Sequence, residues 1–204
     1  MRYSSFVYQV LAATVISSSA AHADQKPLNM EPNLGPVLPP KTPSSSGPAG
    51  GGETVILSDV LGRDRSINIF AGFTRDISLV DERLGDETSN TTVLAPLNSA
   101  IMALPRKPWE DPEDYKNLGA NAYEGQDGEA RAHKNLRRFV EEHVVPASPW
   151  AEGEKVKTLA GGDVWWESKD GVKVIQPDSI EVSSVGSKVA NGEVWILKGA
   201  RNYA

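Results

Sequence analysis

The apolar residues in the first half of the chain predict helices. Residues 55–61 are largely apolar and favour a short helix. Over 64–84 the apolar positions recur three and four apart, which is the spacing of an amphipathic helix. Gly72 and Thr74 weaken the middle of this stretch, so it is either one helix or two helices joined at a kink.

A strand and two further helices are predicted after this stretch. The β-branched and apolar residues 91–94 favour a short strand, which Pro96 ends because proline cannot donate a ladder hydrogen bond. Asn98 can cap the helix that follows. Helical spacing resumes over 129–143. The polar segment between, 106–128, contains proline and glycine and is predicted to be an irregular insert.

The C-terminal part of the chain has the composition of strands and turns. The predicted strands are residues 155–159, 164–167, 172–175, 180–184 and 194–197. Between them, Asp170-Gly171 and Asn191-Gly192 are dipeptides typical of two-residue β-hairpin loops. Helices followed by an antiparallel meander of strands predict an α+β domain.

The N-terminal residues predict export from the cytosol. A positive residue, an apolar stretch and the small-x-small sequence Ala21-His22-Ala23 are typical of a signal peptide, here residues 1–23. An amphipathic helix or a mitochondrial presequence is the alternative, although a single arginine argues against the presequence. Residues 24–53 are rich in Pro, Gly and Ser and are predicted to form a disordered linker. A folded domain over 54–199 and a short tail over 200–204 are expected after it.

Composition narrows the class of protein. The 204 residues carry a net charge of −6, so no basic surplus is present to neutralise the phosphates of a nucleic acid. The absence of cysteine excludes disulfides, thiolate metal ligands and a cysteine nucleophile. Neither an apolar stretch of bilayer-spanning length nor a lipid-anchor signal is found, so we expect no membrane anchor.

Three segments resemble, in order, the signature segments of fasciclin-type domains. Residues 91–101 read Thr-Thr-Val-Leu-Ala-Pro-Leu-Asn-Ser-Ala-Ile and are similar to the family's Thr-Val-Phe-Ala-Pro-Thr-Asn-x-Ala-Phe segment. Residues 139–146 resemble its Tyr-His-Val-Val-Pro segment, and residues 190–197 resemble its Ser-Asn-Gly-x-Val-His-x-Ile-Asp segment. The signature positions present in this chain are Thr92, Ala95, Pro96, Asn98, His143, Asn191 and Gly192.

The resemblance implies a fold and a class of function. The fold is a β-wedge of about seven mostly antiparallel strands with several helices packed against it. The function is adhesion or binding, without catalytic residues, cofactor or metal, as in small fungal members of which some are vacuolar. Where the family has Thr, Tyr, His and an acid, this chain has Leu97, Glu142, Trp195 and Lys198. Glu142 weakens the transfer of an adhesion role, because the family's Tyr-His pair is associated with integrin contact in animal members.

Asn90 is a candidate for N-glycosylation, and His143 is a candidate for contact with a ligand. Asn90 begins the N-glycosylation sequon Asn90-Thr91-Thr92 at an expected surface turn, and an unmodified asparagine is the alternative. His143 is a ligand contact, a pH switch, or a buried histidine bonded to a backbone or hydroxyl partner. His133 lies ten residues before it, which is not the spacing of a helical metal-binding pair.

Four tryptophans are candidates for ligand contact. Trp165 and Trp166 are adjacent on a predicted strand, so their side chains point to opposite faces and one of them enters the core. Trp109 and Trp150 lie in Pro-flanked loops, where exposed aromatic side chains often bind sugars or proteins. The alternative for each tryptophan is that it covers the edge of the core.

Three functions remain open from the sequence. The first is a non-catalytic binding or adhesion module in the vacuole lumen, the cell wall or outside the cell, with an unidentified protein or polysaccharide partner. The second is the binding or storage of a small molecule. A hydrolase is the least supported, because Gly-x-Ser-x-Gly is absent and the acids of the 106–128 insert lie in a polar segment that neither desolvates nor positions them. The oligomeric state is not predicted.

Overall fold

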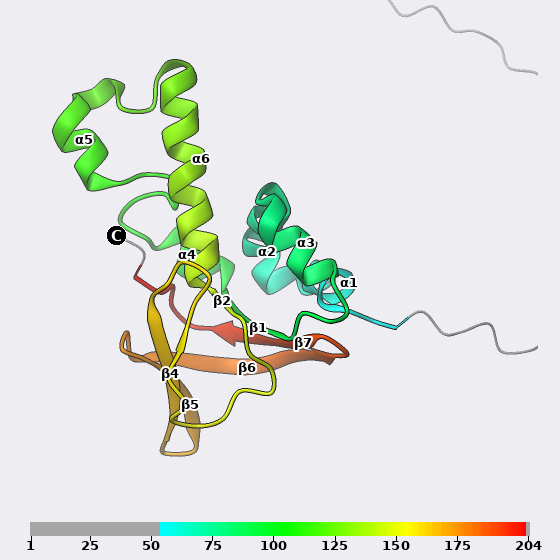
Figure 1. Cartoon of the computed structure of the whole chain (residues 1–204). Helices are drawn as coiled ribbons and strands as arrows, with labels where there is room; N and C mark the ends of the chain where they lie inside the picture. Colours follow the sequence, from blue (N-terminus) through cyan, green and yellow to red (C-terminus); the bar gives the residue numbers. More distant parts are fainter. Residues whose placement is uncertain (1–53, 203–204) are drawn as a thin grey trace, which may run out of the picture. The chain divides into compact units, whose positions relative to one another are not determined.

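Residues 54–202 are described by the structure, which is a computed structural model of the chain (Figure 1). The predicted signal peptide and linker lie outside these described residues. The helices are α1 (Leu57–Leu61), η1 (Arg65–Ile67), α2 (Asn68–Asp76), α3 (Ser78–Gly85), α4 (Asn98–Met102), α5 (Pro112–Leu118), η2 (Gly119–Asn121) and α6 (Gly125–Glu142). The strands are β1 (Thr91–Pro96), β2 (Val144–Val145), β3 (Val156–Lys157), β4 (Asp163–Lys169), β5 (Val172–Gln176), β6 (Ile180–Val189) and β7 (Gly192–Leu197).

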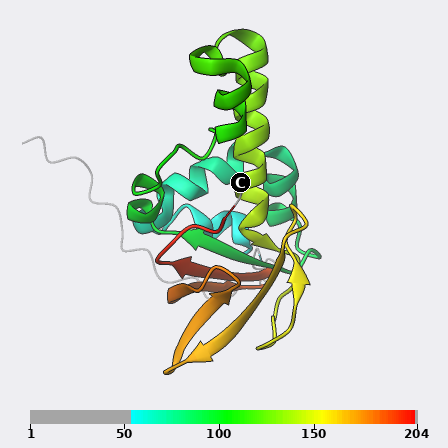
Figure 2. The same ribbon diagram turned by 90° about the vertical axis from the view of Figure 1, so that its left-hand side faces the viewer.

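The described strands form one seven-stranded sheet in the order β2-β1-β7-β6-β5-β4-β3. β1 and β7 are parallel, and every other neighbouring pair is antiparallel. Figures 1 and 2 show β4 and β5 crossing the direction of β6 and β7 steeply, so the sheet is bent. The predicted α+β fold, a mostly antiparallel β-wedge with packed helices, is therefore confirmed.

The two faces of the central strands are covered by two separate sets of apolar side chains. On one face, Phe70 of α2 and Phe139 of α6 are fully buried in a cluster that includes Val93 of β1. On the other face, Leu94 of β1 belongs to a cluster with Trp195 of β7. Neighbouring residues of a strand point to opposite faces, and for this reason β1 is buried at every position and shows no alternation of apolar and polar residues.

The helical stretch predicted over 64–84 is divided into separate helices. Ile77, between α2 and α3, has an extended backbone with φ −111° and ψ 95°, which interrupts the helix. The two-helix alternative is therefore the correct one. Gly72 lies within α2, so the break falls after the residue that weakened the helical pattern.

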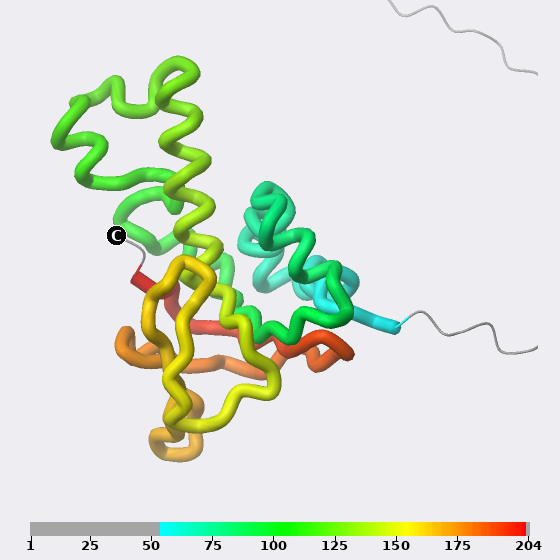
Figure 3. The backbone as a smooth tube through the Cα atoms, in the orientation of Figure 1, coloured from blue at the N-terminus to red at the C-terminus, as the bar shows by residue number. Residues whose placement is uncertain are grey.

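The prediction that residues 106–128 form an irregular insert is wrong. This segment contains the helix α5, which begins at Pro112. Its N-cap residue, Asp111, accepts a hydrogen bond from the amide of Glu113 at 2.8 Å. Both are ordinary signals of a helix start, and the many turn residues around them obscured the pattern. α6 also begins earlier than predicted, at Gly125. Figure 3 shows α5 and the first turns of α6 standing away from the sheet.

The structure assigns Asn98 a different role from the predicted cap of its own helix. It is the first residue of α4, and its side chain reaches the start of α2 instead. Its Oδ1 accepts from the amide of Ile69 at 3.1 Å, and its Nδ2 donates to Arg65 O and Asn68 Oδ1, both at 2.8 Å. Asn98 thus satisfies an amide in the first turn of α2 that has no partner within that helix.

The C-terminal residues pack against the domain beyond the predicted end at residue 199. Ala200 contacts the helix-side core, and only 4% of Arg201 is exposed. The Arg201 guanidinium lies 3.8 Å from the carboxylate of Glu142 and 3.3 Å from that of Asp178. These contacts make Arg201 part of the folded domain rather than of a tail.

Candidate functional site

The signature residues of the first segment lie inside the fold. Thr92 donates its hydroxyl to the carbonyl oxygen of Ala147 at 2.6 Å, which fixes the chain that follows β2. Ala95 and Pro96 are buried in β1. These three side chains are therefore structural residues of the domain rather than part of its surface.

The β6–β7 hairpin differs from its prediction by one residue. Gly192 is paired with Val189 across the hairpin, so the two loop residues are Ala190-Asn191 rather than Asn191-Gly192. By contrast, Asp170-Gly171 is the two-residue loop between β4 and β5, with φ values of 51° and 80°. In the β6–β7 loop, Asn191 therefore contributes to the fold through the hydrogen bonds of its side chain.

Asn191 connects this hairpin to the helical layer. Its side chain is completely buried. Its Oδ1 accepts from the amide of Leu57 at 2.8 Å, and its Nδ2 donates to the carbonyl oxygens of Leu84 and Asp86, both at 3.0 Å. One side chain thus joins α1, the end of α3 and the sheet.

His143 is a buried histidine with two backbone partners. Its Nε2 accepts from the amide of Arg201 at 2.9 Å, which places its proton on Nδ1, and Nδ1 donates to the carbonyl oxygen of Phe139 at 2.7 Å. Burial, together with the nearby Arg201 guanidinium, lowers its pKa from 6.5 to about 3. The structure therefore favours the buried, backbone-bonded interpretation over a ligand contact.

This geometry predicts that acid destabilises the domain. Between pH 6.5 and 3 the unfolded chain binds a proton at residue 143 that the folded chain does not. The free energy of unfolding should therefore fall by about 2 kcal/mol from pH 7 to pH 5. Urea unfolding at both pH values measures it. His143→Gln should remove most of this fall, and replacing the exposed His133 by glutamine should not. An unchanged fall in His143→Gln would contradict the assignment.

Two of the residues that depart from the family pattern have charged partners. Glu142 accepts a hydrogen bond from the hydroxyl of Thr158 at 3.1 Å and lies beside Arg201. Lys198 pairs with Glu181 at 2.5 Å. The carboxylate that replaces the family's tyrosine is therefore occupied within the domain.

Two of the four candidate contact tryptophans, Trp150 and Trp166, are buried and belong to the core. Trp150 stacks on Trp195 with ring centroids 5.5 Å apart, and Trp166 meets the same ring edge-on at 5.6 Å. The ammonium of Lys173 lies 3.1 Å from the centroid of Trp166, and burial lowers its pKa. The three tryptophans are therefore part of the buried core rather than of an exposed contact surface.

The other two candidates are half-buried. Trp165 packs against the edge of the cluster that contains Trp166, and the ammonium of Lys155 lies 4.6 Å from the centroid of its ring. Trp109 lines an open groove of about 370 Å³, here called the Trp109 groove. Its lining residues are Asp76, Trp109, Glu129, Ala132, His133 and Leu136.

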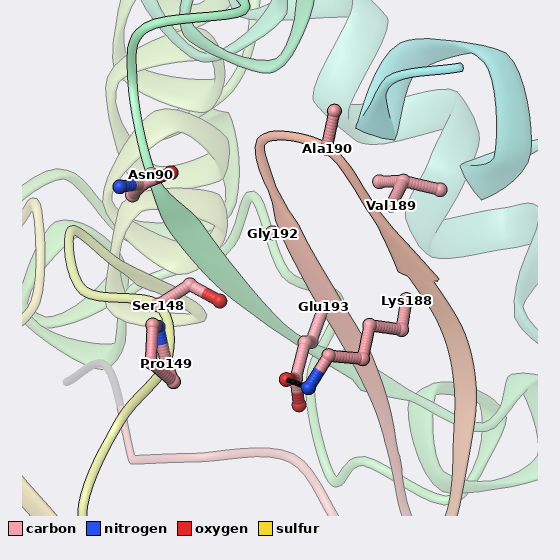
Figure 4. Close-up of a pocket in the computed structure, with 8 residues that line it drawn as sticks. All are labelled: Asn90, Ser148, Pro149, Lys188, Val189, Ala190, Gly192 and Glu193. Carbon is pink, nitrogen blue, oxygen red and sulfur yellow. Dashed lines mark ion pairs between the residues drawn. The ribbon is translucent and has the colours of Figure 1, made fainter. Parts of the chain in front are cut away.

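A second concavity, here called the hairpin pocket, lies between the β6–β7 hairpin, the start of β1 and the loop after β2 (Figure 4). Its volume is about 320 Å³. Its lining residues are Asn90, Ser148, Pro149, Lys188, Val189, Ala190, Gly192 and Glu193. Lys188 and Glu193 form an ion pair of 2.7 Å across the two strands, and Glu193 also accepts from Trp195 Nε1 at 2.9 Å. The pocket therefore combines charged, amide and apolar groups.

The grouping of His, Asp and Glu residues and the pKa of one acid in the 106–128 insert bear on the remaining sequence-based hypotheses. Within 54–202 no group of three His, Asp or Glu could hold a metal ion. In the 106–128 insert, hydrogen bonds from Asn135 and Tyr123 hold the pKa of Asp114 below its usual value. A general acid requires the opposite shift. In the same part of the chain, no helix has the length and apolar character needed to cross a bilayer.

The chain is similar along most of its length to fungal proteins. A FAS1 domain-containing protein of Neurospora crassa is 62% identical over 190 residues, covering 91% of this chain and 83% of that protein. Proteins of the same description from Aspergillus fumigatus and Emericella nidulans are 53% and 48% identical. They cover 78% and 85% of this chain, and 69% and 75% of their own lengths. No protein-family model matches the chain.

A solved structure shows the same fold. It is a FAS1 domain pair from the insect cell adhesion molecule Fasciclin I, with a TM-score of 0.51 and 13% sequence identity. The match covers 72% of this chain, which spans half of that two-domain chain. The fold and the buried signature residues define a fasciclin-type domain. Because its sequence is 62%, 53% and 48% identical to these three fungal proteins, the chain belongs to the family of FAS1 domain-containing proteins.

Proposed function

We propose that this protein is a non-catalytic binding module of the secretory pathway, acting in the vacuole lumen, in the cell wall or outside the cell. Membership of the FAS1 family supports a binding role, and the signal-like residues 1–23 support export. The proposed partner is a protein. The observation that carries this proposal is the Trp109 groove.

The Trp109 groove fits an apolar side chain that has basic neighbours. Trp109, Ala132 and Leu136 supply apolar surface, and Asp76 and Glu129 add two exposed carboxylates. These carboxylates favour lysine or arginine beside the apolar side chain of the partner. Lysine or arginine adds an ion pair to each carboxylate, which the hydroxyl groups of a neutral polysaccharide cannot form, so a protein segment complements the groove better.

Trp109 is held in place before any partner binds. Its ring meets Phe73 nearly at a right angle, with centroids 6.4 Å apart. Its carbonyl oxygen accepts a hydrogen bond from Asn135 of α6 at 3.2 Å. A tryptophan fixed in this way loses little conformational entropy on binding, which is the property of a strong interface residue.

Trp109→Ala is expected to weaken peptide binding by about 30-fold or more, because a central aromatic anchor contributes about 2 kcal/mol or more. The measurement is a screen of a random peptide library on the purified domain, followed by calorimetry on the enriched peptides. Enriched sequences should carry an apolar residue next to lysine or arginine.

Two controls separate this binding site from the rest of the surface. Trp165→Ala removes another half-buried tryptophan and should leave the affinity unchanged. The double change Asp76→Asn and Glu129→Gln should weaken binding and reduce its dependence on salt, because exposed charges are screened. Equal affinity of the wild type and Trp109→Ala would refute the assignment of the groove.

A further inference from the structure

Asn90 is both the first residue of a glycosylation sequon and part of the hairpin pocket. It is exposed, and it lies directly before β1. Figure 4 shows it at the start of β1, on the opposite side of the pocket from Lys188 and Glu193. The geometry points to the hairpin pocket as the binding site of an N-linked glycan on Asn90, with its first N-acetylglucosamine against Pro149 and the Lys188–Glu193 pair.

The backbone at Asn90 is fixed by two hydrogen bonds, so the position of an attached sugar depends only on the torsions beyond Cα. Arg83 Nη2 donates to the carbonyl oxygen of Asn90 at 3.1 Å. The next amide, that of Thr91, donates to Asn191 O at 2.9 Å. Only the two side-chain torsions of Asn90 and the glycosidic linkage remain to orient the first sugar.

The pocket carries groups that match the parts of N-acetylglucosamine. The ring of Pro149 offers an apolar surface for the acetamido methyl group. Lys188 donates to sugar oxygens, and the carboxylate of Glu193 accepts from sugar hydroxyl or amide groups. Glu193 is held in position by Trp195 Nε1 at 2.9 Å. A volume of about 320 Å³ lies at the lower end of the roughly 300–1,000 Å³ typical of small-molecule pockets.

The modification must precede folding. The sequon hydroxyl, that of Thr92, is buried and donates to Ala147 O at 2.6 Å in the folded domain. The transfer forms a bond between Asn90 Nδ2 and C1 of the sugar. It breaks the bond between C1 and a lipid pyrophosphate donor, which leaves with the amide proton. This inference rests on the export that the proposed function includes.

The test is expression of the full chain in yeast, once with its own residues 1–23 and once with a strong export leader in their place. We expect a glycan mass on the wild type and none on Asn90→Gln.

After the glycan is trimmed to a single N-acetylglucosamine, the wild type should still have a Tm about 2–4 °C above that of Asn90→Gln. Lys188→Met should reduce this difference, and the acetamido methyl group should give nuclear Overhauser contacts to the Pro149 ring. The same two chains made without export should share one Tm.

Each outcome decides between the proposals. No glycan with either leader, or a glycan that leaves the Tm unchanged and shows no contact to Pro149, overturns the glycan site. A glycan with the strong leader but not with residues 1–23 contradicts the proposed export and leaves the glycan site supported.

Discussion

Gly192→Ala is expected to lower the free energy of unfolding by more than about 4 kcal/mol. A Cβ at this position would lie 1.8 Å from the carbonyl oxygen of Thr91 and 2.9 Å from Leu57 Cδ1. The φ of +154° is also one that side-chain-bearing residues rarely adopt. The carbonyl belongs to the neighbouring strand of the parallel β1–β7 pair, so relief requires separating two central strands. Urea unfolding followed by tryptophan fluorescence measures the loss.

Gly72→Ala is the matched control for this experiment. Gly72 lies within α2, and a Cβ there would meet no atom within 4 Å. The substitution should stabilise the domain by about 0.5–1 kcal/mol, because alanine is the better helix former. Similar stability changes in the two variants would show that β1 and β7 tolerate greater separation than the structure indicates.

Asn191→Asp is expected to cost about 3–5 kcal/mol, although the two side chains have nearly the same shape. One carboxylate oxygen would still accept from the amide of Leu57. The other would face the carbonyl oxygens of Leu84 and Asp86, which now receive hydrogen bonds from Nδ2. A buried negative charge would thus meet two acceptors, and the two hydrogen bonds from the hairpin to the end of α3 would be lost.

Asn117→Asp provides the control for Asn191→Asp, because Asn117 is exposed on α5. It should change the free energy of unfolding by less than about 0.5 kcal/mol. Thermal and urea unfolding of both variants are the measurements. An Asn191→Asp protein as stable as its control would contradict the importance of the two hydrogen bonds that Asn191 donates to the end of α3.

The sequence predicted those features that depend on local patterns. The spacing of apolar residues located the helices, and the Asp170-Gly171 turn located the β4–β5 hairpin. α5 was missed because its cap at Asp111 and its Pro112 lie among residues that also favour turns. β2, with only two residues, is too short to carry a periodic signal of its own.

Long-range partners of polar residues were not predictable from local patterns. Asn191 and the carbonyl oxygen of Leu84 are 107 positions apart, and Asn98 bonds to α2 rather than to its own helix. In the same way, Trp150 looks like an exposed loop residue in the sequence, yet it stacks against Trp195 in the core. The Trp109 groove arises only when α6 packs beside α2, so the sequence identified its tryptophan but not its shape.

The most direct test of the binding proposal is photo-crosslinking in living fungal cells. A photoreactive amino acid replaces His133 in the Trp109 groove, and in a second strain it replaces the exposed Val172 of β5. Both chains keep residues 1–23. We expect discrete protein adducts from position 133 in a secreted or vacuolar fraction, and none from position 172. Adducts of equal yield at both positions, or none at position 133, would contradict the proposal that this FAS1 domain binds a protein through its Trp109 groove.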